Sequence, residues 1–324
     1  MIVAAGLTPA WQYVLVFDEL RAGEVNRARE SRWFASGKAV NVALATRSLG
    51  SPSRLISFIG GASGAALAED LEATGAEAEW VTSGTPTRVC TTLINRTRSE
   101  TTELVENSAP VTPQELNRYQ RAFSTAAATA SVVVLSGSLP TDTPKSYYRD
   151  LLESASSSTA LAASGSQPAR LVLDIRGPEL LNALRFRPFL IKPNREELAS
   201  TMGRSLDDDS ALVAAMRELN RGGAEWVLVT SGGSPAWLSG HDRLWRIAPP
   251  PGIDVVNPIG CGDCVAAGVA VGLAEGLDIH RCVALGFGAA AANLERMECA
   301  RFDSARAREW SARVTSTEVE GPAS

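Results

Sequence analysis

The sequence is poor in the residues that mark several common functional classes. It has only two histidines, His241 and His280, and neither lies beside a plausible nucleophile, so a histidine-based triad is not indicated. Its five scattered cysteines do not form the framework of a disulfide-rich secreted protein. A basic leader and a long apolar run are also missing, since the longest run, about 265–274, is too short to span a bilayer. We therefore expect a cytoplasmic protein with no membrane partner.

Concentrated positive charge is likewise missing. The formal net charge is −5, and the 31 lysines and arginines form no block. Nucleic-acid binding relies on such positive patches, so a nucleic-acid partner is not expected. The sequence favours small molecules as the partners of this protein.

Short β-branched runs alternate with longer helical patterns along most of the chain. The runs predicted as buried strands are 2–6, 54–60, 131–137, 170–175, 188–192 and 225–232. The segments predicted as helices are 37–49, 63–74, 112–128, 144–158, 194–202 and 207–221. This alternation predicts an α/β fold in which helices cover both faces of a parallel sheet.

Two stretches, 11–36 and 86–106, interrupt the alternation. Both have strand-like patterns with no helix between them, so we expect a small β-sheet lid over the carboxyl ends of the parallel strands. The α/β body then comprises 1–10, 37–85 and 107–315, and 316–324 is a C-terminal tail. The Ser/Ala-rich stretch 154–169 is interpreted as a helix end and a loop of the body.

The stretch NPIGCGDCVAAGVAVGL (257–273) has a carboxylate, Asp263, at the start of an apolar run. Pro258, Gly260 and Gly262 predict a turn that opens a buried helix. The N–H groups at such a helix start favour an anion, and Asp263 is placed to accept a proton from a hydroxyl that attacks a phosphate there. The alternative is that Asp263 only stabilises the helix dipole, and this motif by itself does not separate the two.

The same stretch contains Cys261 and Cys264 at the CxxC spacing of thiol-redox sites and of half a zinc site. No second CxxC or histidine pair completes a zinc site, and the motif lies far from the amino-terminal strand. The usual nucleotide motifs are absent, because SGKAVN is not a P-loop and no strand leads into GxGxxG.

Polar residues also gather where the first long helix begins. Lys38 and Asn41 share one face of its first turns and, behind Gly37, form a cradle for a polar ligand. A solvated lysine next to a helix-start asparagine is the structural alternative. Arg88 in the lid is placed to clamp a phosphate, although a lone arginine is usually only solvated.

The segment KPNREEL (192–198) follows a predicted strand and opens a helix. Lys192, Asn194 and Glu197 suit nucleotide phosphates and a water-coordinated Mg²⁺. Asn194 and Glu197 also fit a helix capping box. Sequence spacing does not separate these two interpretations.

These pieces together resemble the ribokinase-like (PfkB) family of carbohydrate kinases, in the branch of 1-phosphofructokinase and tagatose-6-phosphate kinase. The resemblance covers about 2–295 and is carried, in order, by LTPAWQ, GEVNR, ASGKAVNVA, TRVCTTLI, VVVLSGSLP, LVLDIRG, IKPNREEL, VLVTSGG and NPIGCGDCVAAG. It implies a ribokinase-like parallel sheet sandwiched by helices, with a small β-sheet lid. It also implies ATP- and Mg²⁺-dependent phosphorylation of a hydroxyl on a sugar or sugar phosphate, and a homodimer through the lid.

The resemblance further implies a role for each matching residue. Asp263 would be the catalytic base, and the amides of Gly260, Cys261 and Gly262 the anion hole for the transferred phosphoryl group. The expected cofactor-binding residues are Lys192, Asn194, Glu197, Thr230, Gly232 and Asn293, with Glu197 and Asn194 serving Mg²⁺ through water and Asn293 near the adenine. The expected substrate-binding residues are Gln12, Arg27, Gly37, Lys38, Asn41, Arg88 and Ser138.

The chain departs from the family pattern mainly at the substrate end. Gln12 stands where the branch usually has an aspartate that grips sugar hydroxyls, and Ser36 and Ala39 replace glycines of GGKGxN. These changes point to an acceptor other than fructose 1-phosphate or tagatose 6-phosphate. They also leave open a protein of the same fold that binds sugars or nucleotides without catalysis.

Overall fold

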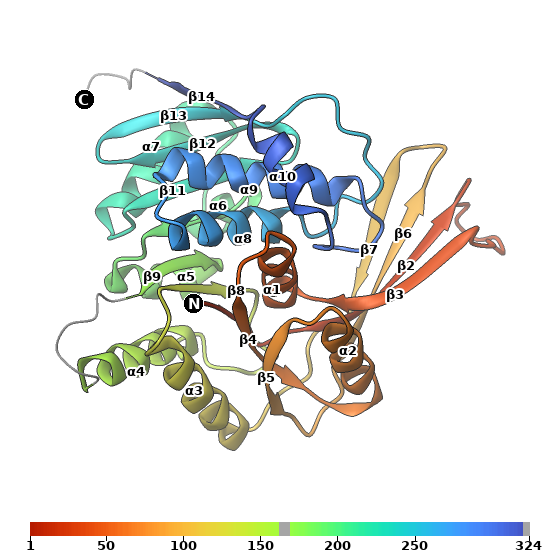
Figure 1. The fold of residues 1–324 in the computed structure, drawn as a ribbon, viewed down its shortest axis with the longest axis horizontal. Coiled ribbons are helices and arrows are strands. Elements are labelled where there is room, and N and C mark those ends of the chain that lie inside the picture. The colour runs from red at the N-terminus through yellow and green to blue at the C-terminus, as the bar shows by residue number, and fades with distance from the viewer. Residues whose placement is uncertain (162–168, 320–324) are drawn as a thin grey trace.

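The computed structural model describes residues 1–161 and 169–319 (Figure 1). Its strands form a ten-stranded sheet with helices on both faces and a four-stranded sheet that projects from one side. This arrangement confirms the predicted fold class. Residues 162–168, part of the stretch expected to be a helix end and loop, lie outside the described residues, as do 320–324.

The ten-stranded sheet has the order β14-β13-β12-β11-β10-β9-β8-β1-β4-β5. Its strands are β1 (Ile2–Ala5), β4 (Ser53–Ile59), β5 (Glu77–Thr82), β8 (Val132–Ser136), β9 (Arg170–Asp174), β10 (Leu190–Ile191), β11 (Trp226–Ser231), β12 (Ser234–Gly240), β13 (Arg243–Ala248) and β14 (Thr315–Glu318). From β5 through β11 all neighbouring strands pair in parallel. Six of these seven strands are the predicted ones, and β5 is additional.

The sheet is mostly parallel, as predicted, and one edge of it is antiparallel. There β11, β12, β13 and β14 pair antiparallel. Two short turns, 232–233 and 241–242, connect the first three of them, and both are too short to hold a crossover helix. Residues 316–318, expected to belong to a tail, pair with β13 as part of β14.

Helices cover the two faces of this sheet (Figure 1). Their bounds are α1 (Lys38–Ser48), α2 (Gly61–Ala73), α3 (Pro113–Ala127), α4 (Tyr147–Leu161), α5 (Gly177–Ala183), α6 (Arg195–Met202), α7 (Asp209–Arg221), α8 (Cys261–Ala274), α9 (Ile279–Leu294) and α10 (Ser304–Ser311). Buried residues of α1, α2, α8, α9 and α10 form one core with the sheet, and those of α3 to α7 form a second core on its other face. Helices α8 and α9 pack closely where Gly268 faces Gly286. A Cβ atom added at Gly268 would lie only 2.5 Å from the Cα of Gly286, so the contact requires glycine.

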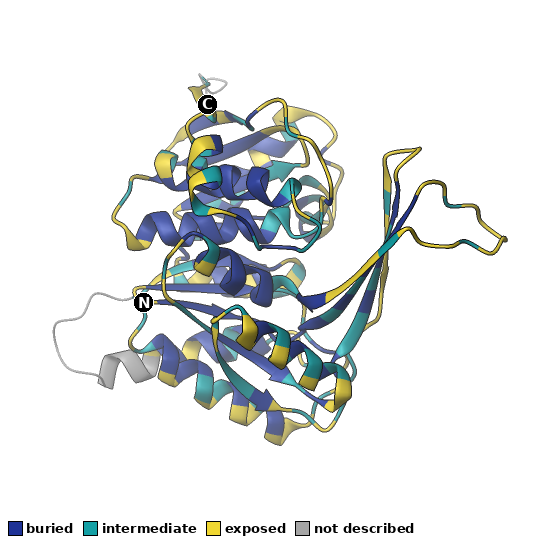
Figure 2. Cartoon of the chain, turned by 45° about the vertical axis from the view of Figure 1, so that its right-hand side comes forward, coloured by how far each residue is buried: buried dark blue, intermediate teal, exposed yellow. Residues whose placement is uncertain are grey.

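The smaller sheet has the order β3-β2-β6-β7. Its strands are β2 (Ala10–Phe17), β3 (Glu30–Ser36), β6 (Arg88–Asn95) and β7 (Glu100–Val105). They come from the two stretches that interrupt the α/β alternation. Figure 2 shows this sheet projecting from the body, with exposed residues along its outer loops.

The parallel strands bring distant polar residues to one edge. Asp174 ends β9, Lys192 directly follows β10, and Thr230 lies at the end of β11. The carboxyl ends of parallel strands meet at the same edge of a sheet, which is where α/β proteins bind ligands. Among the helices of the described residues, none is long and apolar enough to cross a bilayer.

Candidate active site

The turn before α8 leaves a helix start without a side-chain cap. Gly260 is the N-cap residue, with a left-handed φ of 80°, and as a glycine it has no side chain to accept a hydrogen bond from the first turn. The first intrahelical bond runs from the Cys264 amide to the Gly260 carbonyl at 2.9 Å. The amides that precede Cys264 in the helix therefore have no helical partner and are available to an anion.

Asp263 lies in this first turn and is almost completely buried, with 6% of its surface exposed. Its Oδ2 accepts a 2.7 Å hydrogen bond from Nδ2 of Asn41. Burial raises the pKa of Asp263 to about 7, and the nearby Asp174 adds to the rise, whereas Lys38, Asn41 and Lys192 oppose it. A carboxylate with such a pKa can accept and release a proton near neutral pH.

A second carboxylate, Asp174, lies between two lysines. Its Oδ1 is 3.2 Å from Nζ of Lys192, and its Oδ2 is 3.4 Å from Nζ of Lys38. Burial alone would raise the pKa of Asp174, but the two ammonium groups outweigh it and hold the pKa below its ordinary value. Burial would lower the pKa of Lys38, but the surrounding carboxylates Asp174, Glu197 and Asp263 raise it, so both members of the pair stay charged.

Lys192 reaches from this pair toward the start of α8. A Cβ at Gly262 would lie 3.4 Å from the Lys192 ammonium nitrogen. The lysine side chain is 4% exposed. A positive charge therefore lies beside the uncapped amides, and the two together favour a phosphate group at this place.

The segment 192–198 forms a helix capping box and also carries a carboxylate beside Lys38. Asn194 caps α6, since its Oδ1 accepts from the Glu197 amide at 2.7 Å, while Glu197 Oε2 accepts from the Asn194 amide at 3.0 Å. The other carboxylate oxygen of Glu197, Oε1, is 3.4 Å from Nζ of Lys38. The capping box thus exists and also holds Glu197 with one oxygen toward the site.

The residues expected near the nucleotide lie on two different elements. The Asn194 segment pairs with Thr230 through an isolated bridge, which brings the end of β11 next to the start of α6. Gly232 occupies the turn after β11 with a left-handed φ of 54° and no atom near its missing Cβ. This open turn leaves space beside Thr230.

Asn293, which is expected to lie near the adenine, has a buried side chain with partners inside the protein. It is 1% exposed, and its Nδ2 donates to the Ile259 carbonyl at 2.9 Å and to the Cys261 sulfur at 3.4 Å. Its Oδ1 accepts from the Ala300 amide at 2.6 Å. The amide is thus fully used within the protein, where it supports the turn before α8.

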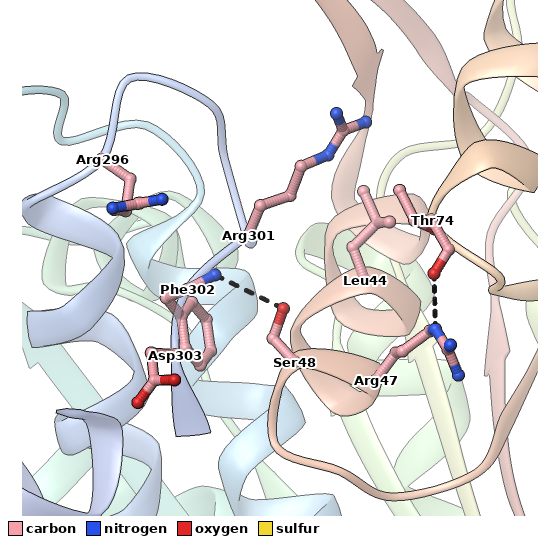
Figure 3. A pocket seen from close by; sticks show the side chains of 8 residues that line it. All are labelled: Leu44, Arg47, Ser48, Thr74, Arg296, Arg301, Phe302 and Asp303. Carbon is pink, nitrogen blue, oxygen red and sulfur yellow. Dashed lines mark hydrogen bonds between the residues drawn. The ribbon is translucent and has the colours of Figure 1, made fainter. Parts of the chain in front are cut away.

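The same turn is supported from α1 through the loop 295–303. Ser48, the last residue of α1, donates to the Ala300 carbonyl at 2.9 Å and accepts from the Phe302 amide at 3.4 Å. Figure 3 shows the outer side of this loop, where a cavity of about 410 Å³ opens at the end of α1. None of the predicted site residues lines that cavity.

Around the start of α1, the structure places Gly37, Thr8 and Ser138. Gly37 has a φ of 101°, and a Cβ there would lie 2.8 Å from the Pro9 Cα, so the sharp entry into α1 requires glycine. Ser138 is exposed, and its hydroxyl lies 3.5 Å from that of Thr8. A ligand at the start of α1 would meet these hydroxyls.

The three predicted contacts from the smaller sheet have different environments. Gln12 is 3% exposed and donates to the Thr92 hydroxyl at 2.8 Å. The guanidinium of Arg88 donates to the carbonyls of Thr8, Pro9 and Glu106, and no carboxylate of the described residues forms an ion pair with it. Arg27 is exposed between β2 and β3, without a hydrogen bond or ion pair within the described chain.

One central residue was missed by the sequence analysis. Asp174 had been quoted within LVLDIRG but was given no role, although it links Lys38 and Lys192. The available signal was a carboxylate at the end of a buried strand, where a charge without partners would be costly. Only the fold shows that its partners lie at the start of α1 and directly after β10.

Cys261 and Cys264 lie in an environment typical of unreactive thiols. All five cysteines are free thiols. Burial raises the pKa of Cys261 to about 11 and that of Cys264 well above its ordinary value. Reactive thiols have lowered pKa values, so this site does not favour the thiol-redox interpretation.

Comparisons with known proteins agree with this geometry. The profile of the pfkB family carbohydrate kinases matches residues 1–305. The chain is 29% identical to a 1-phosphofructokinase of Borreliella burgdorferi over 83% of each chain, and 28% identical to a 1-phosphofructokinase of Bacillus subtilis over 88% of this chain and 90% of the relative. A solved possible 1-phosphofructokinase of Thermotoga maritima is 21% identical, covers 98% of this chain and 99% of its own, and superposes with a TM-score of 0.87.

Proposed function

Because the chain belongs to the pfkB family of carbohydrate kinases and is therefore a phosphotransferase with an alcohol acceptor, we propose that Asp263 is its general base. The observation that carries this proposal is the position of Asp263 in the first turn of α8, next to uncapped amides and to Lys192. A hydroxyl that attacks the terminal phosphoryl group of ATP loses its proton, and a carboxylate with a pKa of about 7 accepts it.

The positive groups of the site would bind the transferred phosphoryl group. The amides of Gly260, Cys261 and Gly262 lie at the start of α8, where the helix dipole favours negative charge. Lys192 adds a buried ammonium group beside Gly262. These groups are held before the substrates arrive, so they stabilise the transition state with little rearrangement.

The remaining polar groups suit the nucleotide and Mg²⁺. Thr230 and Gly232 border an open turn at the nucleotide side. Among the described residues no cluster of three metal ligands occurs, so Mg²⁺ would be held through water by Glu197 and Asn194 and by the phosphates. When bound, the ion would neutralise phosphate charge, while Lys38 keeps Glu197 oriented.

We propose a sugar phosphate as the acceptor. Two curated relatives are 1-phosphofructokinases, and Arg88 carries a guanidinium without a carboxylate partner among the described residues. Gly37, Lys38, Asn41 and Ser138 would contact the sugar. Gln12, whose Nε2 already donates one hydrogen bond to Thr92, would contribute its carbonyl oxygen. Arg27 and the pairing of two smaller sheets in a homodimer remain predictions from the sequence.

The proposal is tested with an acceptor panel. ADP release would be measured with ATP and Mg²⁺ against fructose 1-phosphate, fructose 6-phosphate, tagatose 6-phosphate and their unphosphorylated sugars. Turnover of one or more phosphorylated sugars, at higher kcat/KM than the matching free sugar, is expected. Faster turnover of the free sugar would refute the phosphorylated acceptor, and binding without turnover of any acceptor would favour a sugar-binding protein that lacks catalysis.

A further inference from the structure

We propose that Ser36 is a positioning residue that orients the carboxylate of Asp263 through the side chain of Asn41. This inference rests on the proposed function, in which Asp263 accepts the acceptor's proton. It concerns a hydroxyl that the pattern GGKGxN lacks, because the first residue of that pattern is glycine. Ser36 is therefore an addition of this chain.

The three side chains form a continuous hydrogen-bonded chain. The hydroxyl of Ser36 donates to Asn41 Oδ1 at 3.2 Å, and Asn41 Nδ2 donates to Asp263 Oδ2 at 2.7 Å. The residues are only 2%, 3% and 6% exposed, respectively. Water therefore does not readily replace these partners, and each bond constrains the next one.

The local backbone explains why Ser36 can reach Asn41. Ser36 is the last residue of β3, and Asn41 lies in the first turns of α1. Gly37 lies between the two elements, and its left-handed φ of 101° turns the chain sharply. The end of a strand in the smaller sheet is thereby folded over the start of α1.

The Asn41 amide is held at both of its ends. The ionised carboxylate of Asp263 only accepts hydrogen bonds, so it faces Nδ2, and the Ser36 hydroxyl donates to Oδ1. Rotation of the amide by half a turn would place Oδ1 against the carboxylate. The donated hydrogen bond stabilises the charged form of Asp263 and lowers its pKa. Without Ser36, part of this stabilisation should be lost.

The same arrangement distinguishes the two oxygens of Asp263. Oδ2 is occupied by Asn41, whereas Oδ1 forms no hydrogen bond within the described residues. Oδ1 is therefore the oxygen that receives the proton of the acceptor hydroxyl. Ser36 acts only through Asn41 and has no assigned contact with either substrate.

The test is the pH dependence of kcat/KM for the Ser36→Ala variant, measured from about pH 5.5 to about pH 9. On the acid side of the profile, loss of one buried hydrogen bond should raise the pH at which kcat/KM is half-maximal by about half a unit. At pH values below this midpoint (the acid limb), kcat/KM should be about three-fold lower than in the wild type. Near pH 9, where Asp263 is ionised in both proteins, the rates should agree. Ser36→Thr keeps the hydroxyl and should restore the wild-type limb.

A matched control is Ser57→Ala. The Ser57 hydroxyl is also buried and donates at 2.8 Å, but to the backbone carbonyl of Gly6, so its loss should leave the acid limb unchanged. In an Asn41→Ala background, Ser36→Ala should cause no additional shift. An unshifted limb for Ser36→Ala, or an equal shift in both backgrounds, would overturn the inference.

Asp263→Asn distinguishes failure of the proposed function from failure of the role of Ser36 alone. If Asp263→Asn retains near wild-type turnover, the proposed function itself fails. If Asp263→Asn is inactive while Ser36→Ala has a wild-type profile, only the role of Ser36 fails. Should Ser36→Ala not fold, Ser36→Gly, which restores the residue of the pattern, would be measured in its place with the same expected shift.

Discussion

The ionisation of Asp263 should control the rate of this kinase near neutral pH. Burial raises the pKa of this carboxylate to about 7. If the charged form accepts the proton, kcat/KM should fall to about one tenth of its plateau at pH 6 and reach about nine tenths at pH 8. An aspartate with an ordinary pKa would give no such limb above about pH 5.

The perturbation that isolates this effect is Asp263→Asn. The amide has nearly the same shape and keeps an oxygen that can accept from Asn41, so the local structure should survive. Loss of the base should lower kcat about 10²- to 10⁴-fold, because general bases contribute rates of this order. Nucleotide affinity should change little, since Asp263 is not expected to hold the phosphates.

The assay is ADP release at saturating ATP and Mg²⁺ across the pH range, with nucleotide binding measured by titration. Phosphate groups of both substrates also ionise near pH 6. The residual rate of Asp263→Asn provides the control, because it retains substrate ionisation and lacks that of the base. An acid limb that persists unchanged in this variant, or a near wild-type kcat, would refute the assignment.

Protein stability should report the same ionisation. The pKa of Asp263 in the folded protein lies above its ordinary value of 3.8, so the folded state binds the proton more tightly than the unfolded state. The resulting stability is fully present below the unfolded pKa and is lost as the pH rises through about 7. Asp263→Asn should therefore flatten the decline in the free energy of unfolding that urea titrations measure between pH 5 and pH 8 in the wild type.

Three other predictions follow from the surrounding groups. Asp174→Asn should lower the free energy of unfolding by about 3–5 kcal/mol in urea titrations, because it leaves a buried ammonium group unpaired; an unchanged midpoint would contradict this. Arg88→Ala should raise the KM for a phosphorylated acceptor about 10- to 100-fold. The control is Arg29→Ala, which removes an exposed arginine that is paired with Asp18 and should leave this KM unchanged. Equal effects of the two substitutions would argue against a phosphate contact. Replacing Cys261 and Cys264 with serine should preserve most kinase activity in the ADP assay, and its abolition would revive the thiol-redox interpretation.

Local sequence patterns predicted most of the body because its elements have strong periodicity. The buried run of β8 and the helical pattern of α3 both lie within short stretches of neighbouring residues. The antiparallel edge was not predicted, although the turn between β11 and β12 consists of Gly232 and Gly233. The next turn, 241–242, has a weaker signal, because His241 and Asp242 adopt the left-handed conformations that glycine usually supplies.

The contacts among the site residues were harder to predict from the sequence, because they join segments that lie far apart along the chain. Asn41 and Asp263 are 222 positions apart, and Lys38 and Asp174 are 136 positions apart. Spacing within a motif cannot predict such contacts. Nor does the replacement of a glycine by Ser36 show that the Ser36 hydroxyl donates to Asn41.

The contrast between Asp174 and Asp263 explains how one site can combine a fixed charge with a titrating base. Asp174 lies within 3.4 Å of two ammonium groups, which keep it ionised despite its burial. Asp263 accepts only from a neutral amide, so burial dominates and its pKa rises to about 7. Two carboxylates whose environments separate their pKa values can serve different roles. Asp174 would keep Lys38 and Lys192 in place for the phosphates, and Asp263 would exchange the proton.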